Sequence, residues 1–347
     1  MDLRGQFLLD PDVVFLNHGS FGACPRPVFE AYQRWQRELE REPVEFLARR
    51  WERLLAEARA DLARYVGAQA DDLVFVTNAM TGMNTLARSL VEPGDEVLTS
   101  DQEYEAVDAA WEAAGATLVR APVESLWEHA TDRTRVLSLS HVTSPTGLVV
   151  PVDEHCRRAR GLGILTVVDG AHAPGHVPID LAALGADAYT GNCHKWLCAP
   201  KGAGFLWVRE ELQPRIDPLV VTWGWDEPEF TKRHLRSGTR DPAAWLAVAA
   251  AIEFQREWGW DDVRARCHAL VERFGEASGL PVVTDAFGQM ASFELPPGDP
   301  EAVQLRLWDE HRIEVPCFDW NGRPLLRLSV QGYNTEEDVE RLVAALA

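Results

Sequence analysis

The chain has 347 residues, of which 46% are hydrophobic and 25% are charged, an ordinary composition for a globular protein with a buried core. Its 54 acidic residues outnumber 34 basic ones, and a net charge of −20 opposes binding to nucleic acid or to an anionic membrane surface. No run approaches the roughly 20 apolar residues of a membrane span, and we find no secretory signal. Six scattered cysteines without a CxxC pair favour the reducing cytoplasm over a disulfide-bonded scaffold.

Two helices are predicted first, because apolar residues recur at helical spacing over 27–39 and 45–66. From residue 73, short apolar strands alternate with helical segments, a pattern typical of an α/β domain with a mostly parallel sheet. Seven strands are predicted, at 73–77, 96–100, 117–123, 135–142, 164–169, 187–192 and 204–209.

The composition and the predicted pattern of elements change toward the C-terminus. Segment 210–242 is irregular and rich in Trp, Pro and Gly, and 243–259 reads as a helix. After Gly279 we expect a small α+β domain, with strands at 281–285, 290–295, 313–317 and 325–330 and helices at 299–311 and 335–347. The boundary is expected near 260–275, which divides the chain into a large α/β domain (20–265) and a small domain (266–347, joined by segment 1–19).

Ligands of open α/β sheets bind at the carboxyl ends of the strands, where several polar residues are expected. The loop 77–82, TNAMTG, precedes a helix, and N–H groups at a helix start bind anions; the alternative is that Thr77 or Asn78 only caps the helix. Asp169 ends the strand 164–169, where a buried carboxylate needs a partner, unless it serves a turn in the Gly-rich loop. His172 is either a ligand contact or a satisfied loop histidine.

Two basic residues are candidates as well. Lys195 lies in HKW after the strand 187–192, among aromatic residues, where a lysine can have a lowered pKa and act as an amine nucleophile. The alternative is an exposed charge, which suits Lys201 and Lys232 better. Arg327 lies inside the apolar strand 325–330 and needs a partner, either a ligand carboxylate or an acidic residue of the protein.

Together these residues match the needs of pyridoxal 5′-phosphate, which requires a lysine for a Schiff base, an acid against the pyridine nitrogen and a phosphate-binding loop. Asp169 and Lys195 are 26 residues apart, which leaves room for one crossover element between adjacent strands.

At these residues the sequence resembles the class V aminotransferase family of fold-type-I pyridoxal-phosphate enzymes, and within it the isopenicillin N epimerase-like branch. The resemblance covers nearly the whole chain, and Asp-x-x-His followed by His-Lys-Trp is quite specific to the family. The matching stretches are FLNHGSFG (15–22), TNAMTG (77–82), DQEYEAVDAAW (101–111), SHVTSPTG (140–147), VVDGAHAPG (167–175), TGNCHKWLCAPKGAGFLWV (190–208), SGTRDPAAWLA (237–247) and LLRLSVQGYNT (325–335).

The resemblance implies a fold-type-I architecture and a set of site residues. Lys195 would form the Schiff base, Asp169 would hold the pyridine nitrogen, and Tyr104 would stack on the ring. His172 and Thr143 would lie near the phenolic oxygen, with His172 among the catalytic residues.

Further residues are implied around the phosphate and the substrate. Asn78, Ala79, Asn192 and His194 would contact the phosphate, and Thr239 would reach the phosphate of the neighbouring subunit's cofactor. The resemblance therefore implies a homodimer with shared active sites.

Arg327 would bind the α-carboxylate of a small amino-acid substrate, with Asn17 near the same group. No metal site is expected. The aromatic loop 221–230 either lines the side-chain pocket or anchors the dimer interface.

The sequence departs from the family pattern in three places. Tyr104 stands where many desulfurases have a histidine, which suits the epimerase-like branch. Cys317 is closer to Arg327 than the sulfur-accepting cysteine of desulfurases would be, so we interpret it as a core or pocket residue. Met80 replaces a frequent threonine of the phosphate loop.

The main hypothesis is an enzyme acting at the α-carbon of an amino acid or amino-acid conjugate, with Lys195 as general base. Epimerisation, transamination and β-elimination all use the same residues, so the reaction stays open. One alternative is a carbon–sulfur lyase or cysteine desulfurase. Another, from a different class, is a metal-dependent hydrolase with Asp169, His172 and His194 as ligands.

Overall fold

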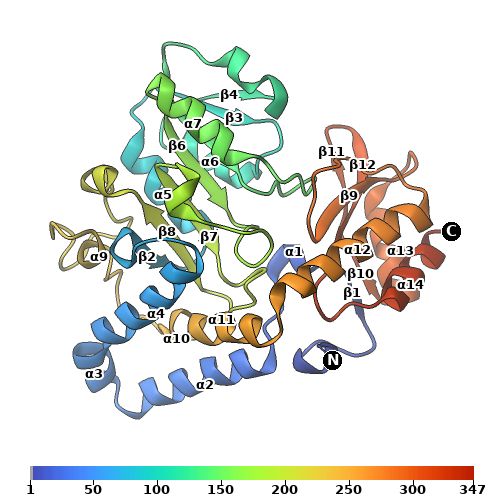
Figure 1. The fold of residues 1–347 in the computed structure, drawn as a ribbon, viewed down its shortest axis with the longest axis horizontal. Helices are drawn as coiled ribbons and strands as arrows, with labels where there is room; N and C mark the ends of the chain where they lie inside the picture. The colour runs from blue at the N-terminus through green and yellow to red at the C-terminus, as the bar shows by residue number, and fades with distance from the viewer. Residues whose placement is uncertain (1–2) are drawn as a thin grey trace.

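A seven-stranded sheet forms the centre of the larger part of the protein, which is described over residues 3–347 by a computed structural model (Figure 1). The strand order is β2-β8-β7-β6-β5-β3-β4; β8 runs antiparallel to its neighbours, and the other neighbouring pairs are parallel. This confirms the predicted mostly parallel sheet and its seven strands. The strands are β2 (Leu73–Val76), β3 (Glu96–Ser100), β4 (Thr117–Ala121), β5 (Thr134–Ser140), β6 (Leu165–Gly170), β7 (Ala188–Asn192) and β8 (Gly204–Val208).

Both faces of this sheet are buried except at its edge strand β4, which explains why the other strands are apolar almost throughout. In β2, Phe75 packs into the larger core, and Val74 and Val76 pack into a second core on the opposite face. The second core is closed by α5 and α6, which contribute Met83 and Trp111. The sheet is therefore a middle layer between helices.

The helices of this part flank the sheet or extend along the molecule, as α2 does in Figure 1. The predicted helix 45–66 is divided, because five residues, Phe46–Arg50, form a π-helical turn (η2) between α3 and α4. The helices are α1 (His18–Phe21), α2 (Arg26–Arg41), α3 (Pro43–Glu45), α4 (Trp51–Tyr65), α5 (Ala79–Leu90), α6 (Glu105–Ala113), α7 (Val152–Leu162), α8 (Leu181–Leu184), α9 (Phe230–Arg233), α10 (Ala243–Leu246) and α11 (Val248–Glu257). Short 3-10 turns are η1 (Arg4–Gln6), η3 (Ala70–Asp72), η4 (Val123–His129) and η5 (Glu210–Arg215).

The C-terminal part is the predicted small α+β unit (Figure 1). An antiparallel sheet of order β11-β12-β9 packs against helices, and the N-terminal strand β1 pairs in parallel with β10. The elements are β1 (Val14–Phe15), α12 (Trp260–Ser278), β9 (Met290–Glu294), α13 (Pro300–His311), β10 (Ile313–Glu314), β11 (Cys317–Trp320), β12 (Arg323–Ser329) and α14 (Glu336–Leu346).

One predicted strand of this part, 281–285, is wrong. Only an isolated bridge, Val282 to Phe293, is formed there. Pro281 has no N–H to donate, and the segment makes just two backbone bonds to β9, from Val283 to Ser292 and from Glu294 to Pro281.

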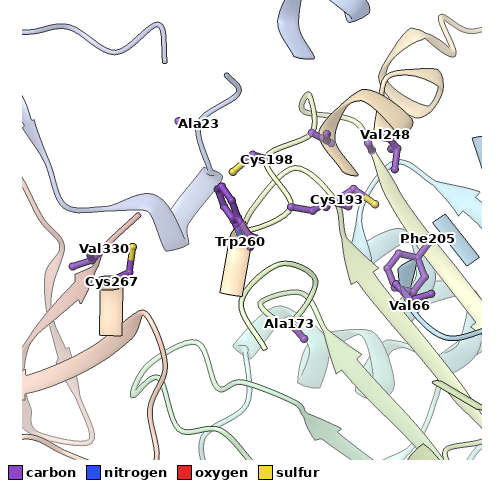
Figure 2. Close-up of a cluster of buried hydrophobic side chains, with 14 of the residues drawn as sticks. Ala23, Val66, Ala173, Cys193, Cys198, Phe205, Val248, Trp260, Cys267 and Val330 are labelled. Atoms are coloured by element: carbon purple, nitrogen blue, oxygen red, sulfur yellow. The ribbon is translucent and has the colours of Figure 1, made fainter. Parts of the chain in front are cut away.

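The larger apolar core is continuous between the two parts of the chain. Figure 2 shows Phe205 of β8, Trp260 and Cys267 of α12 and Val330 within one cluster. The predicted domain boundary at residue 265 falls within helix α12, which is unbroken from Trp260 to Ser278. The boundary therefore stays a prediction. Within residues 3–347, no helix is long and apolar enough to cross a membrane.

Candidate active site

A cavity of about 430 Å³ opens at the carboxyl edge of the central sheet. This volume is within the roughly 300–1,000 Å³ typical of small-molecule pockets. Its walls come from the ends of β5, β6 and β7, the first turn of α5, the helix α1 and the strand β12. Nine of the predicted site residues line it: Asn78, Ala79, Tyr104, Asp169, His172, Asn192, His194, Lys195 and Arg327.

Lys195 lies in the loop between β7 and β8, and its side chain lines the cavity. Lys195 Nζ lies 2.9 Å from Nε2 of His172. Burial, and secondly the charge of Arg327, lower the pKa of Lys195 to about 7. In a large fraction of molecules the amine is therefore uncharged at neutral pH, as a nucleophile requires. The alternative of an exposed charge is wrong for Lys195.

The backbone of Lys195 is held from outside the sheet by the segment 15–22. The carbonyl of Lys195 accepts a hydrogen bond from Nε2 of His18 at 3.0 Å, and Tyr333 donates to Nδ1 of the same ring. Gly22 has φ +69°, and a Cβ added there would lie 2.0 Å from the carbonyl oxygen of His194. A side chain does not fit at Gly22, so the motif 15–22 is explained by its packing on the lysine loop.

Asp169 is placed by its strand, because β6 lies between β5 and β7 and ends at the cavity. Its Oδ1 accepts a hydrogen bond from the N–H of Ala171 at 2.8 Å, so the turn interpretation is correct in part. The same buried carboxyl group also lines the cavity, and burial raises its pKa. A cationic partner in the cavity would stabilise its charged form.

The first turn of α5 presents the positive end of a helix dipole to the cavity, as an anion site requires. Asn78 caps this helix through Oδ1, which accepts from Thr81 N–H at 2.9 Å, so the capping alternative holds alongside the cavity position. The N–H of Ala79 donates to Oδ1 of Asn192 at 2.8 Å. His194 donates through Nδ1 to the carbonyl of Ala203, and burial lowers the pKa of His194 to about 4.

Arg327 is buried without a carboxylate partner among the described residues, so the alternative of an internal ion pair is wrong. Its guanidinium donates to the carbonyl of Ser144 at 2.6 Å and to the hydroxyl of Ser20 at 3.1 Å. Burial lowers the pKa of Arg327 to about 10. A buried cation whose hydrogen bonds go only to neutral oxygens favours an anionic ligand in the cavity.

Three predicted residues lie outside the cavity wall. Thr143 is buried, and its hydroxyl bonds to Thr146 and to the N–H of Leu148 within the turn after β5. Asn17 accepts a hydrogen bond from the Ser20 hydroxyl at 2.5 Å, and this hydroxyl in turn accepts one from Arg327. Thr239 lines a separate hollow of about 290 Å³ together with residues of the aromatic loop.

Several cavity neighbours were missed by the sequence reasoning. Ser20 and Trp196 stand inside the motifs FLNHGSFG and HKW but carried no assigned role. Glu103, next to Tyr104, is buried between the hydroxyls of Ser100 and Ser140, and burial raises its pKa to about 7. In the sequence, an acid directly before the predicted ring-stacking Tyr104 is the signal that could have found Glu103.

Two features bear on the alternative functions, the cysteine desulfurase and the metal-dependent hydrolase. Burial raises the pKa of Cys317 to about 12, so this thiol is almost never a thiolate near neutral pH, as the core or pocket interpretation expects. Within the described part of the chain, no three His, Cys, Asp or Glu side chains are arranged to hold a metal ion. The metal-dependent hydrolase therefore gains no support from a ligand set.

Comparisons with known proteins bear on the family and the fold of the chain. The profile of the family described as Aminotransferase class-V matches residues 23–342. Isopenicillin N epimerase of Amycolatopsis lactamdurans is 42% identical, over 99% of this chain and 96% of the relative, and that of Streptomyces clavuligerus is 37% identical, over 99% and 97%.

A solved structure, the apo cysteine desulfurase of Thermococcus onnurineus NA1, has the same fold, with a TM-score of 0.87 at 23% identity over 99% of this chain and 96% of that one. These findings confirm the predicted fold type and the prediction of a pyridoxal-phosphate-dependent enzyme. The chain belongs to the class V aminotransferase family.

Proposed function

We propose that the chain holds pyridoxal 5′-phosphate in the cavity at Lys195 and acts at the α-carbon of an amino acid or amino-acid conjugate, as an isopenicillin N epimerase-like enzyme. The observation that carries the proposal is a set of three groups on one cavity, the amine of Lys195, shielded from water, and the buried carboxyl of Asp169 and guanidinium of Arg327. The identity of 42% to an epimerase over nearly the full length favours this branch of the family.

The residues present fit this cofactor group by group. The uncharged amine of Lys195 suits an aldehyde, and the carboxyl of Asp169 suits a protonated pyridine nitrogen. The start of α5 suits a phosphate, with Asn78, Ala79, Asn192 and His194 around it. Tyr104, an aromatic residue of the wall that is 49% exposed, would stack on the ring.

When bound, the cofactor supplies an electron sink for the α-carbon of an amino acid. Arg327 binds the α-carboxylate and thereby orients the α-hydrogen, and Asn17 supports Arg327 through Ser20. Lys195 removes that hydrogen as general base, for which a pKa of about 7 is well matched to neutral pH. His172, in hydrogen-bond contact with Lys195, holds the amine in place.

The proposal includes a homodimer. The loop after β8 exposes a run of apolar side chains, among them Trp223 at 84% and Val221 at 70% exposed. Thr239 lies beside Trp223 in the separate hollow, away from this subunit's own cavity lining. A second copy that covers the loop would let Thr239 reach the phosphate in that copy. We also propose a cytoplasmic location, which the six unpaired thiols support.

The test combines a spectrum with a substrate screen. The purified protein with the cofactor should absorb at about 420 nm, and Lys195→Ala should lose this band together with all turnover. Amino acids and their conjugates are then incubated in D₂O, and loss of the α-proton signal with formation of the other stereoisomer is expected. Persistence of the band and of turnover in Lys195→Ala would refute the proposal. Release of sulfide and pyruvate from cysteine would instead select the carbon–sulfur lyase.

A further inference from the structure

Trp196, the residue after the site lysine, makes a contact that determines where a neighbouring histidine carries its proton. The indole of Trp196 is completely buried, and its Nε1 lies 3.2 Å from Nδ1 of His172. An indole N–H can only donate a hydrogen bond. Nδ1 of His172 is therefore the acceptor and carries no proton.

The other nitrogen of His172 must then hold the ring proton. Burial holds the pKa of His172 well below its usual value, so the ring is neutral and carries a single proton. With Nδ1 occupied as an acceptor, that proton is on Nε2, which lies 2.9 Å from Nζ of Lys195. The imidazole donates, and the amine of Lys195 accepts with its lone pair. Only an uncharged amine can accept in this way.

A second histidine holds the indole in position. The backbone N–H of Gln289 donates to Nε2 of His176 at 2.7 Å, so the proton of His176 is on Nδ1, which donates to the carbonyl of His172 at 3.0 Å. The His176 ring stacks on Trp196, with centroids 4.1 Å apart and planes at 24°. A Cβ on Gly288 would lie 2.5 Å from the His176 ring, so the approach of the backbone before β9 is close.

We propose that Trp196 is a positioning residue, whose indole N–H directs the proton of His172 toward Lys195 and so keeps the lysine amine a hydrogen-bond acceptor, poised to react with an aldehyde. The inference rests on the proposed role of Lys195. Without that N–H, the proton of His172 can move to Nδ1, and Nε2 can then accept from the ammonium form of the lysine. Loss of the indole N–H therefore favours the charged, unreactive amine.

The other charged groups around this pair are unaltered by a change at Trp196. Arg327 disfavours the ammonium form of Lys195, and Asp169 favours it. His176 and His194 also face His172, and burial lowers the pKa of both, so they are neutral near pH 7. A shift in the titration of Lys195 on removal of the indole N–H is thus attributable to His172.

The experiment measures the reactivity of the amine, not turnover. The full-length protein freed of cofactor is mixed with pyridoxal 5′-phosphate between pH 5.5 and 9, quenched with borohydride, and labelling of Lys195 is measured by peptide mass spectrometry. The pH at which labelling of Lys195 is half-maximal, its midpoint, is expected near 7 for the wild type. Trp196→Phe keeps an aromatic ring against His176 but lacks the N–H, and its midpoint should rise by about one unit, which lowers the labelling rate at pH 6 by about tenfold.

Trp260→Phe is the matched control, because the Trp260 indole N–H donates to the carbonyl of Gly175 in the same loop but does not contact His172. Its midpoint should equal that of the wild type. An unchanged midpoint in Trp196→Phe, or equal shifts in both variants, would overturn the inference. Absence of any label on Lys195 in the wild type would instead overturn the proposed function.

A second measurement needs no variant. In the protein with ¹⁵N-labelled histidine, the two ring nitrogens of His172 should give one unprotonated signal for Nδ1 and one protonated signal for Nε2. The reverse assignment would contradict the proposal even if Trp196→Phe failed to fold.

Discussion

Buried charges are partnered differently at the amino edge of the central sheet, where its parallel strands begin, and at the carboxyl edge, where they end. At the amino edge, Glu96 at the start of β3 is bonded by Arg133 and by the hydroxyl of Thr131. Asp187, just before β7, forms an ion pair with Arg209 at 2.7 Å and accepts from the N–H of Thr166 at 2.6 Å. Each carboxylate there is satisfied by its own chain, as a structural role requires.

At the carboxyl edge, three buried groups, those of Lys195, Asp169 and Arg327, face the cavity. Arg327 donates hydrogen bonds only to neutral oxygens, and Lys195 is buried near that same positive charge. Asp169 has a raised pKa, because burial outweighs its hydrogen bond from Ala171. Burial of this kind costs stability, and it is typical of sites whose missing partner is a ligand. The difference between the edges therefore separates carboxylates that hold the fold from groups that do chemistry.

The largest expected effect is on catalysis by a change at Asp169. Asp169→Asn keeps the shape of the carboxyl but removes its charge, so the pyridine nitrogen of the cofactor loses its acidic partner. We expect kcat to fall by about 10²–10⁴-fold, the range for groups that control proton transfer, with little change in the thermal midpoint. Steady-state kinetics and thermal denaturation of the same preparation measure both.

The matched variant is Asp187→Asn at the other edge. Its amide nitrogen would face a donor, either Thr166 or Arg209, so it should lose about 1–3 kcal/mol of stability with nearly normal kcat. If the two variants behaved alike, the contrast between the edges would be wrong.

The next effect is on stability without cofactor. Lys195→Met should stabilise the cofactor-free protein at pH 6 by about 2–4 kcal/mol, because it removes a buried amine whose pKa falls from its ordinary value near 10.5 to about 7 on folding. The unfolded chain binds the extra proton between these values, so wild-type stability should rise with pH from 7 to about 10, and that slope should be smaller in Lys195→Met. Urea unfolding at several pH values tests this; equal slopes would contradict it.

The smallest of the three effects is on substrate affinity. Arg327→Gln should raise KM by about 10–100-fold, because hydrogen bonds to a charged group contribute about 1.5–3 kcal/mol. Arg323 lies on the same strand, but it pairs with Glu294 at 2.7 Å and is half exposed. Arg323→Gln should therefore leave KM within about twofold. A similar rise in both variants would show that β12 is merely disturbed.

Much of the sheet and the site could be predicted from the sequence, because both depend on local patterns. Short apolar runs, buried on both faces except in the edge strand β4, predicted all seven strands, and motif spacing placed Asp169 and Lys195 at neighbouring strand ends. The segment 281–285 has the same β-branched composition as a strand, yet it forms only a bridge. Composition does not show which hydrogen-bonding neighbours a segment will find.

The rest of the site depends on contacts between distant segments. Nothing near Arg327 in the sequence shows that its partners are Ser20 and Ser144 and not an acid. Thr143 belongs to the motif that the resemblance highlights, but the turn after β5 uses its hydroxyl internally. The link from Trp196 to His172 likewise needed coordinates, because it joins two different loops.

The most direct test of the account is to find the lysine that carries the cofactor. The chain offers three lysines, Lys195, Lys201 and Lys232, so a peptide map can distinguish them. Borohydride reduction of the protein with pyridoxal 5′-phosphate, followed by mass spectrometry, should place the phosphopyridoxyl group on Lys195 alone. A label on Lys201 or Lys232, or no covalent label at all, would contradict the assignment of the site.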